Sequence, residues 1–384
     1  MKFNTYSISE LIDEIAMGPF GSNIKVECFV DKGIPVLNGS NLNGFFLRED
    51  SFRYVTEEKA DSLGRANAHR GDIVITHRGT LGQIVCIPET SKYDRYIISQ
   101  SQFRVKCNDK VIPDYLVYYF HTPIGQHKLL ANASQVGVPA LARASTTFQK
   151  IEVDIPDIET QRKVVSILNT IENKININNA INENLEQQIS ALYESWFENF
   201  DLTNGVCPES WNNQELSTIT EISNGKRPPI KAESCSKETP IPIVGAASVM
   251  GFTSEANHTD KILVTGRVGT HGVVQRFNTP CWTSDNTLVI KSSYYEFTNQ
   301  ILQRIDYSAM NRGSTQPLIT QGDMKKVSIL LPDVETLAKF ETFAGTMMNQ
   351  WEANKQENVK LASLRDTLLP KLMSGELDVS DIDL

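Results

Sequence analysis

The chain is 384 residues long, with 40% hydrophobic and 22% charged residues and a formal net charge of −9. This composition is that of an ordinary globular protein with enough core for two or three domains. The acidic balance argues against a protein that binds nucleic acid over its whole surface, but it allows a local basic face.

The sequence shows no signal for secretion or membrane insertion. Its first residues lack the apolar core of a signal peptide, and no apolar run is long enough to cross a bilayer. The six cysteines are scattered without a Cys-x-x-Cys pair. This spacing favours free, mostly buried thiols in a reducing compartment and provides no zinc site. We therefore expect a cytoplasmic protein.

Residues 1–155 lack long helical periodicity and contain short β-type runs separated by Gly, Pro, Asn and Asp. The runs fall at 34–37, 72–76, 82–87 and 102–105. A helix is expected at 113–127, where Pro113 and Asp114 open a stretch rich in Tyr and Leu. These features predict a mostly-β first domain.

A long amphipathic helix is expected in the next segment, 156–200. Apolar residues recur there in steps of three and four, which places them on one face of a helix. The stripe consists of Val164, Leu168, Ile171, Ile175, Leu185, Ile189, Leu192 and Trp196, interrupted by Asn178 and Asn182. At about 1.5 Å per residue, a helix of about 38 residues is roughly 57 Å long.

The same helix recurs near the end of the chain. Adding 176 to each position of the stripe gives a second stripe within 336–373, with asparagines again at Asn354 and Asn358. Only Arg365 interrupts this stripe, and we expect Leu364 to take over the apolar role. The lead-in Pro-Asp-Ile-Glu-Thr at 156–160 also returns as Pro-Asp-Val-Glu-Thr at 332–336. We interpret the repetition as an internal duplication.

The segment 201–331 repeats the first domain in outline. The matching stretches are 12–18 with 219–225, 34–36 with 241–243, and 73–82 with 262–272. Outside them the two halves diverge, which indicates one scaffold used twice with different surfaces. The last segment, 332–384, holds the second helix and an acidic tail from Glu376 that we expect to be frayed.

The sequence therefore predicts a mixed α+β fold, in which two mostly-β domains are joined by two long antiparallel helices with pseudo-twofold symmetry. If the helices meet at their midpoints, Asn178 and Asn182 face Asn354 and Asn358. A buried polar residue in a helix seam fixes the register of the pair. The alternative is that the asparagines point outward and mark a bend.

Several stretches resemble the specificity subunits of type I restriction–modification systems. They are the C-terminal run from Leu361 through Leu-Pro-Lys-Leu to Leu377, Ser-Trp-Phe at 195–197, Pro-Glu-Ser-Trp at 208–211, and the Gly-Thr-x-Gly turns. The resemblance covers essentially the whole chain, in the family's order of domain, helix, domain, helix. It implies two target-recognition domains, 1–155 and 201–331, that read a split, asymmetric sequence in double-stranded DNA.

The resemblance also implies partners and the absence of chemistry in the chain itself. The partners are two adenine methyltransferase subunits and, for cleavage, two ATP-dependent restriction subunits that translocate and cut DNA. No glycine-rich turn with an Asn/Asp-Pro-Pro-aromatic motif is present for methyl transfer, and no phosphate-binding loop is present for ATP. The six histidines form no cluster with metal-ligand spacing. We therefore expect a non-catalytic subunit without cofactor or metal.

The candidate DNA-binding residues are basic or polar side chains in loop-like stretches, where phosphates and bases are contacted. They are Arg65, Arg70, His77, Arg78, Lys92 and Arg95 in the first half, with His69 as a further candidate, and Lys226, Arg227, Lys231, Arg267, His271 and Arg276 in the second. We pair Arg78 with Arg267 as phosphate contacts, because their glycine turns recur in both halves; such turns also serve as simple tight turns of the fold. Reading of bases is expected in the divergent stretches 85–100, 273–283, 46–70 and 253–260.

Two other interpretations remain open. The chain fits the specificity subunit of a related two-subunit system that cuts on both sides of its site. It also fits a structural adaptor whose duplicated domains bind protein. A salt-insensitive response to DNA would favour the adaptor, because phosphate contacts make binding salt-dependent.

Overall fold

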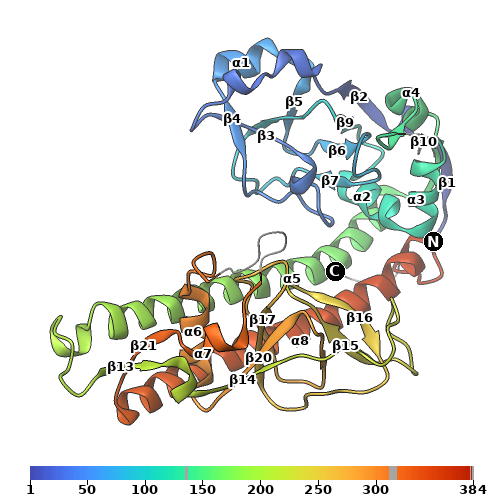
Figure 1. Cartoon of the computed structure of the whole chain (residues 1–384). Coiled ribbons are helices and arrows are strands. Elements are labelled where there is room, and N and C mark those ends of the chain that lie inside the picture. Colours follow the sequence, from blue (N-terminus) through green and yellow to red (C-terminus); the bar gives the residue numbers. More distant parts are fainter. Residues whose placement is uncertain (135–136, 311–317, 381, 383–384) are drawn as a thin grey trace. The chain divides into compact units, whose positions relative to one another are not determined.

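The computed structural model describes residues 1–134, 137–310, 318–380 and 382. The chain forms two compact units (Figure 1). Unit 1 comprises Met1–Asn176 and Glu357–Leu384, and unit 2 comprises Ile177–Gln356. Each unit therefore contains one β-rich segment and one half of each long helix.

Unit 1 is built on an antiparallel sheet with the strand order β2-β9-β6-β7 and a mixed sheet with the order β4-β3-β8-β5, together with the pairs β1-β12 and β10-β11. Its strands are β1 (Asn4–Ser7), β2 (Ile12–Met17), β3 (Ile34–Val36), β4 (Arg53–Val55), β5 (Asn67–His69), β6 (Ile73–Thr76), β7 (Ile84–Cys86), β8 (Arg95–Ile97), β9 (Gln102–Cys107), β10 (Ala133–Ser134), β11 (Ala140–Leu141) and β12 (Glu152–Ile155). Its helices besides the long pair are α1 (Glu57–Ser62), α2 (Pro113–His121), α3 (Pro123–Leu130) and α4 (Ala144–Gln149).

Unit 2 repeats this topology. Its sheets have the orders β14-β20-β17-β18 and β16-β15-β19, with the pair β13-β21. The elements are β13 (Asn212–Glu215), β14 (Thr220–Asn224), β15 (Ile241–Val244), β16 (Val249–Thr253), β17 (Ile262–Gly266), β18 (Gln275–Phe277), β19 (Trp282–Thr283), β20 (Thr287–Ser292), α6 (Tyr295–Arg304), α7 (Gln321–Lys325) and β21 (Ser328–Leu331). In both units one strand pair is parallel, β3 with β8 and β15 with β19. The shared strand order confirms the internal duplication.

The two long helices are α5 (Ile158–Tyr193) and α8 (Val334–Ser374). Each begins after a proline, and an aspartate accepts the amide of the residue three positions on: Asp157 from Thr160 and Asp333 from Thr336, both at 2.9 Å. The first helix ends earlier than the expected Phe200. Glu194–Glu198 form a π-helical turn, and Phe200 then takes a left-handed conformation with φ of 57°, which stops the helix.

In unit 1 the two helices are joined across their polar positions. Arg365 Nη1 donates to Glu172 Oε1 at 2.6 Å, and its guanidinium lies over the Phe45 ring. Glu172 is buried, whereas Leu364 is 48% exposed. The expectation that Leu364 replaces Arg365 in the apolar stripe was therefore wrong. Arg365 keeps its place because a buried carboxylate neutralises it and an aromatic ring packs against it.

In unit 2 the helices meet at two of the predicted asparagines. Asn354 Nδ2 donates to Asn182 Oδ1 at 2.8 Å, and Asn182 Nδ2 donates to the carbonyl of Trp351 at 3.2 Å. Both asparagines are buried. Asn178 is also buried and Asn358 is half-buried. If the helices slipped, these buried polar groups would lose their hydrogen-bond partners, which disfavours any other register. The role of the asparagines in fixing the register stays a prediction.

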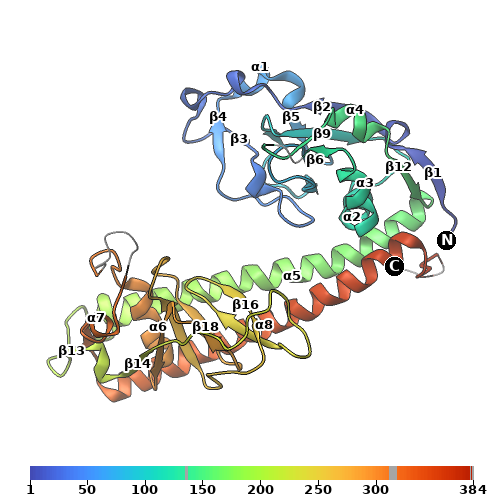
Figure 2. The ribbon, with the colours of Figure 1, turned by 45° about the vertical axis from the view of Figure 1, so that its right-hand side comes forward.

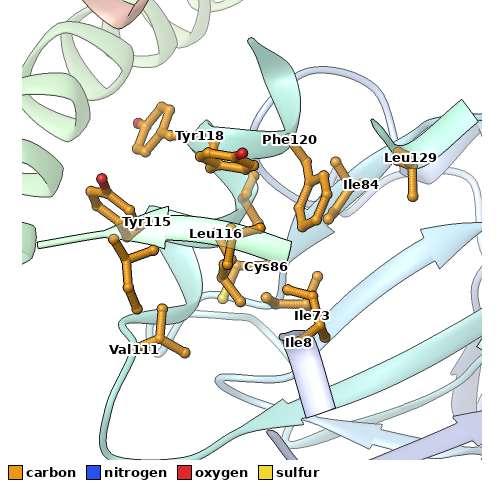
Figure 3. Packing of buried hydrophobic residues seen from close by; sticks show 14 of the residues in the cluster. Ile8, Ile73, Ile84, Cys86, Val111, Tyr115, Leu116, Tyr118, Phe120 and Leu129 are labelled. Atoms are coloured by element: carbon orange, nitrogen blue, oxygen red, sulfur yellow. The ribbon is translucent and has the colours of Figure 1, made fainter. Parts of the chain in front are cut away.

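The core of unit 1 lies between α2 and the sheet that contains β6 and β7. Tyr115, Leu116 and Phe120 of α2 belong to the same buried cluster as Ile73 and Ile84, and Figure 3 shows Phe120 beside Ile84. The expected single helix at 113–127 is two helices. Thr122, which precedes Pro123, has φ −71° and ψ 157°, because a residue before proline avoids the helical region. The Thr122 hydroxyl then caps α3 by accepting the Gly125 amide at 3.0 Å.

The described part of the tail packs against unit 1 and is not frayed. Val379 is fully buried, and Lys163 Nζ donates to the carbonyl of Ser380 at 2.6 Å. Residues 381, 383 and 384 of the expected frayed segment lie outside the described residues. The tail is held because the Val379 side chain reaches the same core as Val164 and Leu372.

The cysteines are only partly as expected. Cys86 and Cys281 are buried free thiols, but Cys207 and Cys235 are exposed. Among the described helices, none is both long enough and apolar enough to cross a membrane.

Candidate nucleic-acid interface

Three segments meet at one edge of unit 1, and we call them the rim of unit 1. They are Gly18 after β2, the turn 77–82 after β6, and the turn 99–102 before β9. The Gly18 amide donates to the carbonyl of Gln102 at 2.8 Å, and the His77 amide donates to the carbonyl of Ser101 at 2.9 Å. Gly79 and Gly82 have φ of 89° and 81°, conformations that favour glycine. The rim is therefore a set of loops held by backbone hydrogen bonds.

The rim of unit 2 is built in the same way, from Gly225, the turn 267–272 and the turn 284–287. The Gly225 amide donates to the carbonyl of Thr287 at 3.1 Å, and the Arg267 amide donates to the carbonyl of Asn286 at 2.8 Å. Gly269 and Gly272 again have positive φ, of 85° and 81°. Gly225 follows the end of β14 and the turn 267–272 precedes β18, two strands that are labelled in Figure 2. The two rims share one backbone plan.

The rims correct our pairing of Arg78 with Arg267. The His77 carbonyl accepts the amide of Leu141 at 2.8 Å, and the Arg267 carbonyl accepts the amide of Ile319 at 3.0 Å. Arg78 is bridged to Ala140, and Val268 to Leu318. Arg267 therefore occupies the place of His77. The strand register agrees, since Thr76 pairs with Gln102 in unit 1 and Gly266 pairs with Thr287 in unit 2, so Gly266 takes the place of Thr76. A Cβ at Gly266 would lie 1.9 Å from the Thr270 carbonyl oxygen.

The predicted residues at the rims differ in the charge they can offer. The side chains of Arg78, Lys226 and Arg227 are exposed and form no ion pair within the described part of the chain. Burial lowers the pKa of His77 below its usual range, so the ring is neutral at neutral pH and adds no positive charge. Among the described residues at the rims, the exposed predicted cations without an ion pair are therefore Arg78 in unit 1 and Lys226 with Arg227 in unit 2.

Arg267 and His271 sit deeper in the rim of unit 2. His271 Nδ1 lies 3.1 Å from the Gly266 carbonyl oxygen. Arg267 Nε and His271 Nε2 are buried atoms without a hydrogen-bond partner among the described residues. Neither group completes its hydrogen bonding within the described residues, which is compatible with contact to a phosphate, a base or water.

The remaining candidates of unit 1 lie away from the rim, around β5 and the start of β8. Most are engaged with acidic groups: Arg65 with Glu14 at 2.8 Å, Arg70 with Asp94 at 3.1 Å and Arg95 with Asp61 at 2.6 Å. Lys92 and His69 are exposed, and the Lys92 ammonium lies over the Tyr93 ring. Arg95 begins β8, whereas the turn of the rim follows the end of that strand. The structure thus separates these residues from Arg78. In unit 2, Lys231 is exposed next to the bridge between Ala232 and Phe252.

Arg276 occupies a structural position in unit 2. Its guanidinium makes two hydrogen bonds to Glu296, at 2.6 and 2.8 Å, and the Glu296 side chain is only 2% exposed. Lys261 Nζ contacts the same carboxylate at 3.0 Å. Removing one partner of a buried ion pair leaves the other charge poorly compensated.

We expect Arg276→Ala to destabilise the chain by about 3 kcal/mol. The matched control is Arg227→Ala, an exposed and unpaired arginine, which should change stability by less than about 0.5 kcal/mol. Urea denaturation followed by circular dichroism measures both. Equal stability of the two variants would mean that the buried pair is not important for folding.

The rims also contain exposed polar residues that the sequence did not single out. They are Gln100 in unit 1, with the half-buried Ser101 beside it, and Asp285 and Asn286 in unit 2. None of them is basic; Gln100 is the last residue of the stretch 85–100, and the other three lie outside the divergent stretches. The sequence signal that could have indicated these turns is the matching pair of glycines, Gly18 and Gly225. Each glycine lies against the first residue of the turn in its own unit, Ser99 or Ser284. The described residues contain no group of His, Cys, Asp and Glu side chains arranged to hold a metal.

The fold is a duplicated scaffold of helices and strands on a pair of long helices. The two rims share a backbone conformation but differ in their side chains. These features define a modular recognition protein. The Type I restriction modification DNA specificity domain matches residues 12–187 and 208–359. The chain belongs to this family.

Known proteins with similarity along most of the chain agree with this assignment. The type I restriction enzyme MjaIX specificity subunit of Methanocaldococcus jannaschii is 24% identical over 86% of this chain and 83% of its own length. The HindI specificity subunit of Haemophilus influenzae is 20% identical, covering 74% and 82%. The crystal structure of a type I restriction–modification S subunit from M. genitalium has the same fold, with a TM-score of 0.62 at 15% identity, covering 97% of this chain and 96% of that one.

Proposed function

We propose that this chain reads DNA sequence for a type I restriction–modification complex and performs no chemistry itself. One observation supports this most directly: the same strand order occurs twice, but the two rims present different side chains. A binder of two identical ligands would gain nothing from such divergence. Two different half-sites, one read by each unit, require it.

Each recognition domain reads one half-site in this proposal. Residues 1–155 read one half and residues 201–331 read the other. Arg78, Lys226 and Arg227 are the best-placed phosphate contacts, because they are exposed, free of ion pairs and located on the rims. The helices α5 and α8 each run through both units, which supports the proposal that they set the number of base pairs between the half-sites.

The partners are two methyltransferase subunits, with two restriction subunits added for cleavage. A duplicated scaffold offers each kind of partner two equivalent docking positions. The net charge of −9 is compatible with DNA binding if the partners supply much of the basic surface around the duplex.

We expect the purified chain alone to show no methyl transfer, ATP hydrolysis or DNA cleavage. Together with its methyltransferase subunits it should methylate adenines in one bipartite sequence. The partners would catalyse methyl transfer, and this chain would provide the sequence specificity. Sequencing that detects methylated bases in a host genome measures the outcome. The control is the methyltransferase without this chain. Turnover by the chain alone, or methylation by the complex without sequence preference, would contradict the proposal.

A further inference from the structure

The same four-residue β-turn precedes the central strand of each four-stranded sheet. In unit 1 it is Ser99–Gln102, where the Gln102 amide donates to the Ser99 carbonyl at 3.0 Å. In unit 2 it is Ser284–Thr287, where the Thr287 amide donates to the Ser284 carbonyl at 3.1 Å. The two central positions of each turn are its tip.

Each turn is fixed from two sides by contacts that do not involve the tip side chains. On one side a Cβ added to Gly18 would lie 1.9 Å from the Ser99 carbonyl oxygen, and one added to Gly225 would lie 2.0 Å from the Ser284 carbonyl oxygen. On the other side the amides of His77 and Arg267 bind the third carbonyl of their turn. The backbone is thus locked in the same conformation in both units.

The tips themselves differ between the units. Unit 1 has Gln100-Ser101, and unit 2 has Asp285-Asn286. Gln100, Asp285 and Asn286 are exposed, and none of these side chains forms a hydrogen bond or ion pair within the described part of the chain. A rigid turn with free polar ends is suited to ligand contact, since little side-chain and backbone order has to be gained on binding.

The chemistry of the tips fits base edges in the major groove. A glutamine amide matches the N6 and N7 edge of adenine with two hydrogen bonds, and a carboxylate accepts from N4 of cytosine. DNA phosphates repel a carboxylate. Asp285 is therefore favourable at a DNA surface only if its carboxylate accepts a hydrogen bond from a donor group of a base. The exposed cations Lys226 and Arg227 lie in the same rim, where the Lys226 amide donates to the Thr283 carbonyl at 2.9 Å.

We propose that these two turns are equivalent base-reading elements, with Gln100 reading an adenine in one half-site and Asp285 reading a cytosine in the other. This proposal rests on the function proposed above and adds the residues that discriminate bases. Specificity at these positions is then set by two side chains on one shared backbone.

The test uses the full chain with its methyltransferase subunits and maps methylated sites by sequencing. Asp285→Asn keeps the shape but replaces the acceptor-only carboxylate with an amide, so the preferred base at one position of one half-site should change from cytosine to adenine. Gln100→Glu should change adenine to cytosine at one position of the other half-site. Gln100→Ala should relax that position, with discrimination falling about tenfold or more.

The matched control is Asp109→Asn, the same chemical change at an exposed residue just beyond the opposite end of β9. It should leave every base of the site unchanged. If the wild-type complex methylates a bipartite site but the variants keep its sequence, the turns are not readers and the proposed function stands. Uniform loss of methylation by an assembled variant complex, without a change of sequence, also overturns the turn proposal. A wild-type complex that methylates no such site overturns the function itself.

Discussion

Replacing residues 1–155 with the corresponding segment of another family member should change one half of the methylated sequence and leave the other half intact. The exchange keeps whole elements together, because β1 pairs with β12 from Asn4 and Ile155 to Ser7 and Glu152. The core of unit 2 contains no residue from this segment. Sequencing of methylated adenines from the hybrid complex gives both half-sites at once.

The reciprocal exchange of 201–331 serves as the control and should change only the other half. In unit 1 the replacement must retain an aromatic residue at the place of Phe45, which packs under Arg365. A hybrid that alters both halves together would show that the two recognition domains do not read independently.

Lengthening both long helices should increase the spacer between the half-sites without changing their bases. We would insert four residues after Glu183 in α5 and four after Ala353 in α8. This adds about 6 Å to each helix, at 1.5 Å per residue, and advances the apolar stripe by about one turn. At about 3.4 Å per base pair, the spacer should grow by one or two base pairs. Methylated-site sequencing reads the spacer directly.

The double insertion keeps Asn182 next to Asn354 and sacrifices the hydrogen bond from Asn182 to the Trp351 carbonyl, a loss of about 1 kcal/mol. Insertion in α5 alone is the matched control. It displaces one helix against the other, so methylation should fall sharply. An active double variant with the original spacer would mean that the methyltransferase subunits set the distance.

The helices and the duplication were predictable because their signals are periodic. A stripe repeated with a constant offset needs no knowledge of tertiary contacts. The periodicity could not predict which contacts a single residue of the stripe would make. Arg365 stays in the stripe because Glu172 and Phe45 neutralise and cover it, and both are distant in sequence. The helix break at Thr122, by contrast, is encoded locally by Pro123.

The rims were less predictable, for two physical reasons. Charge alone does not identify a contact residue, since Arg65, Arg70, Arg95 and Arg276 are all engaged with carboxylates of their own unit. Residues that match in the sequences of the two halves also need not occupy equivalent positions in the two units. Arg267 matches Arg78 by residue type, but the strand register and the backbone hydrogen bonds place it at the position of His77.

The locked turns at Ser99–Gln102 and Ser284–Thr287 have a consequence for how such a protein can evolve. Their conformation depends on main-chain hydrogen bonds and on two glycines, so the exposed side chains at the tips contribute little to folding. Substitutions at exposed positions of this kind typically change stability by less than about 0.5 kcal/mol. New sequence preferences can therefore arise by point mutation without compensating changes in the core, and each unit can change independently of the other.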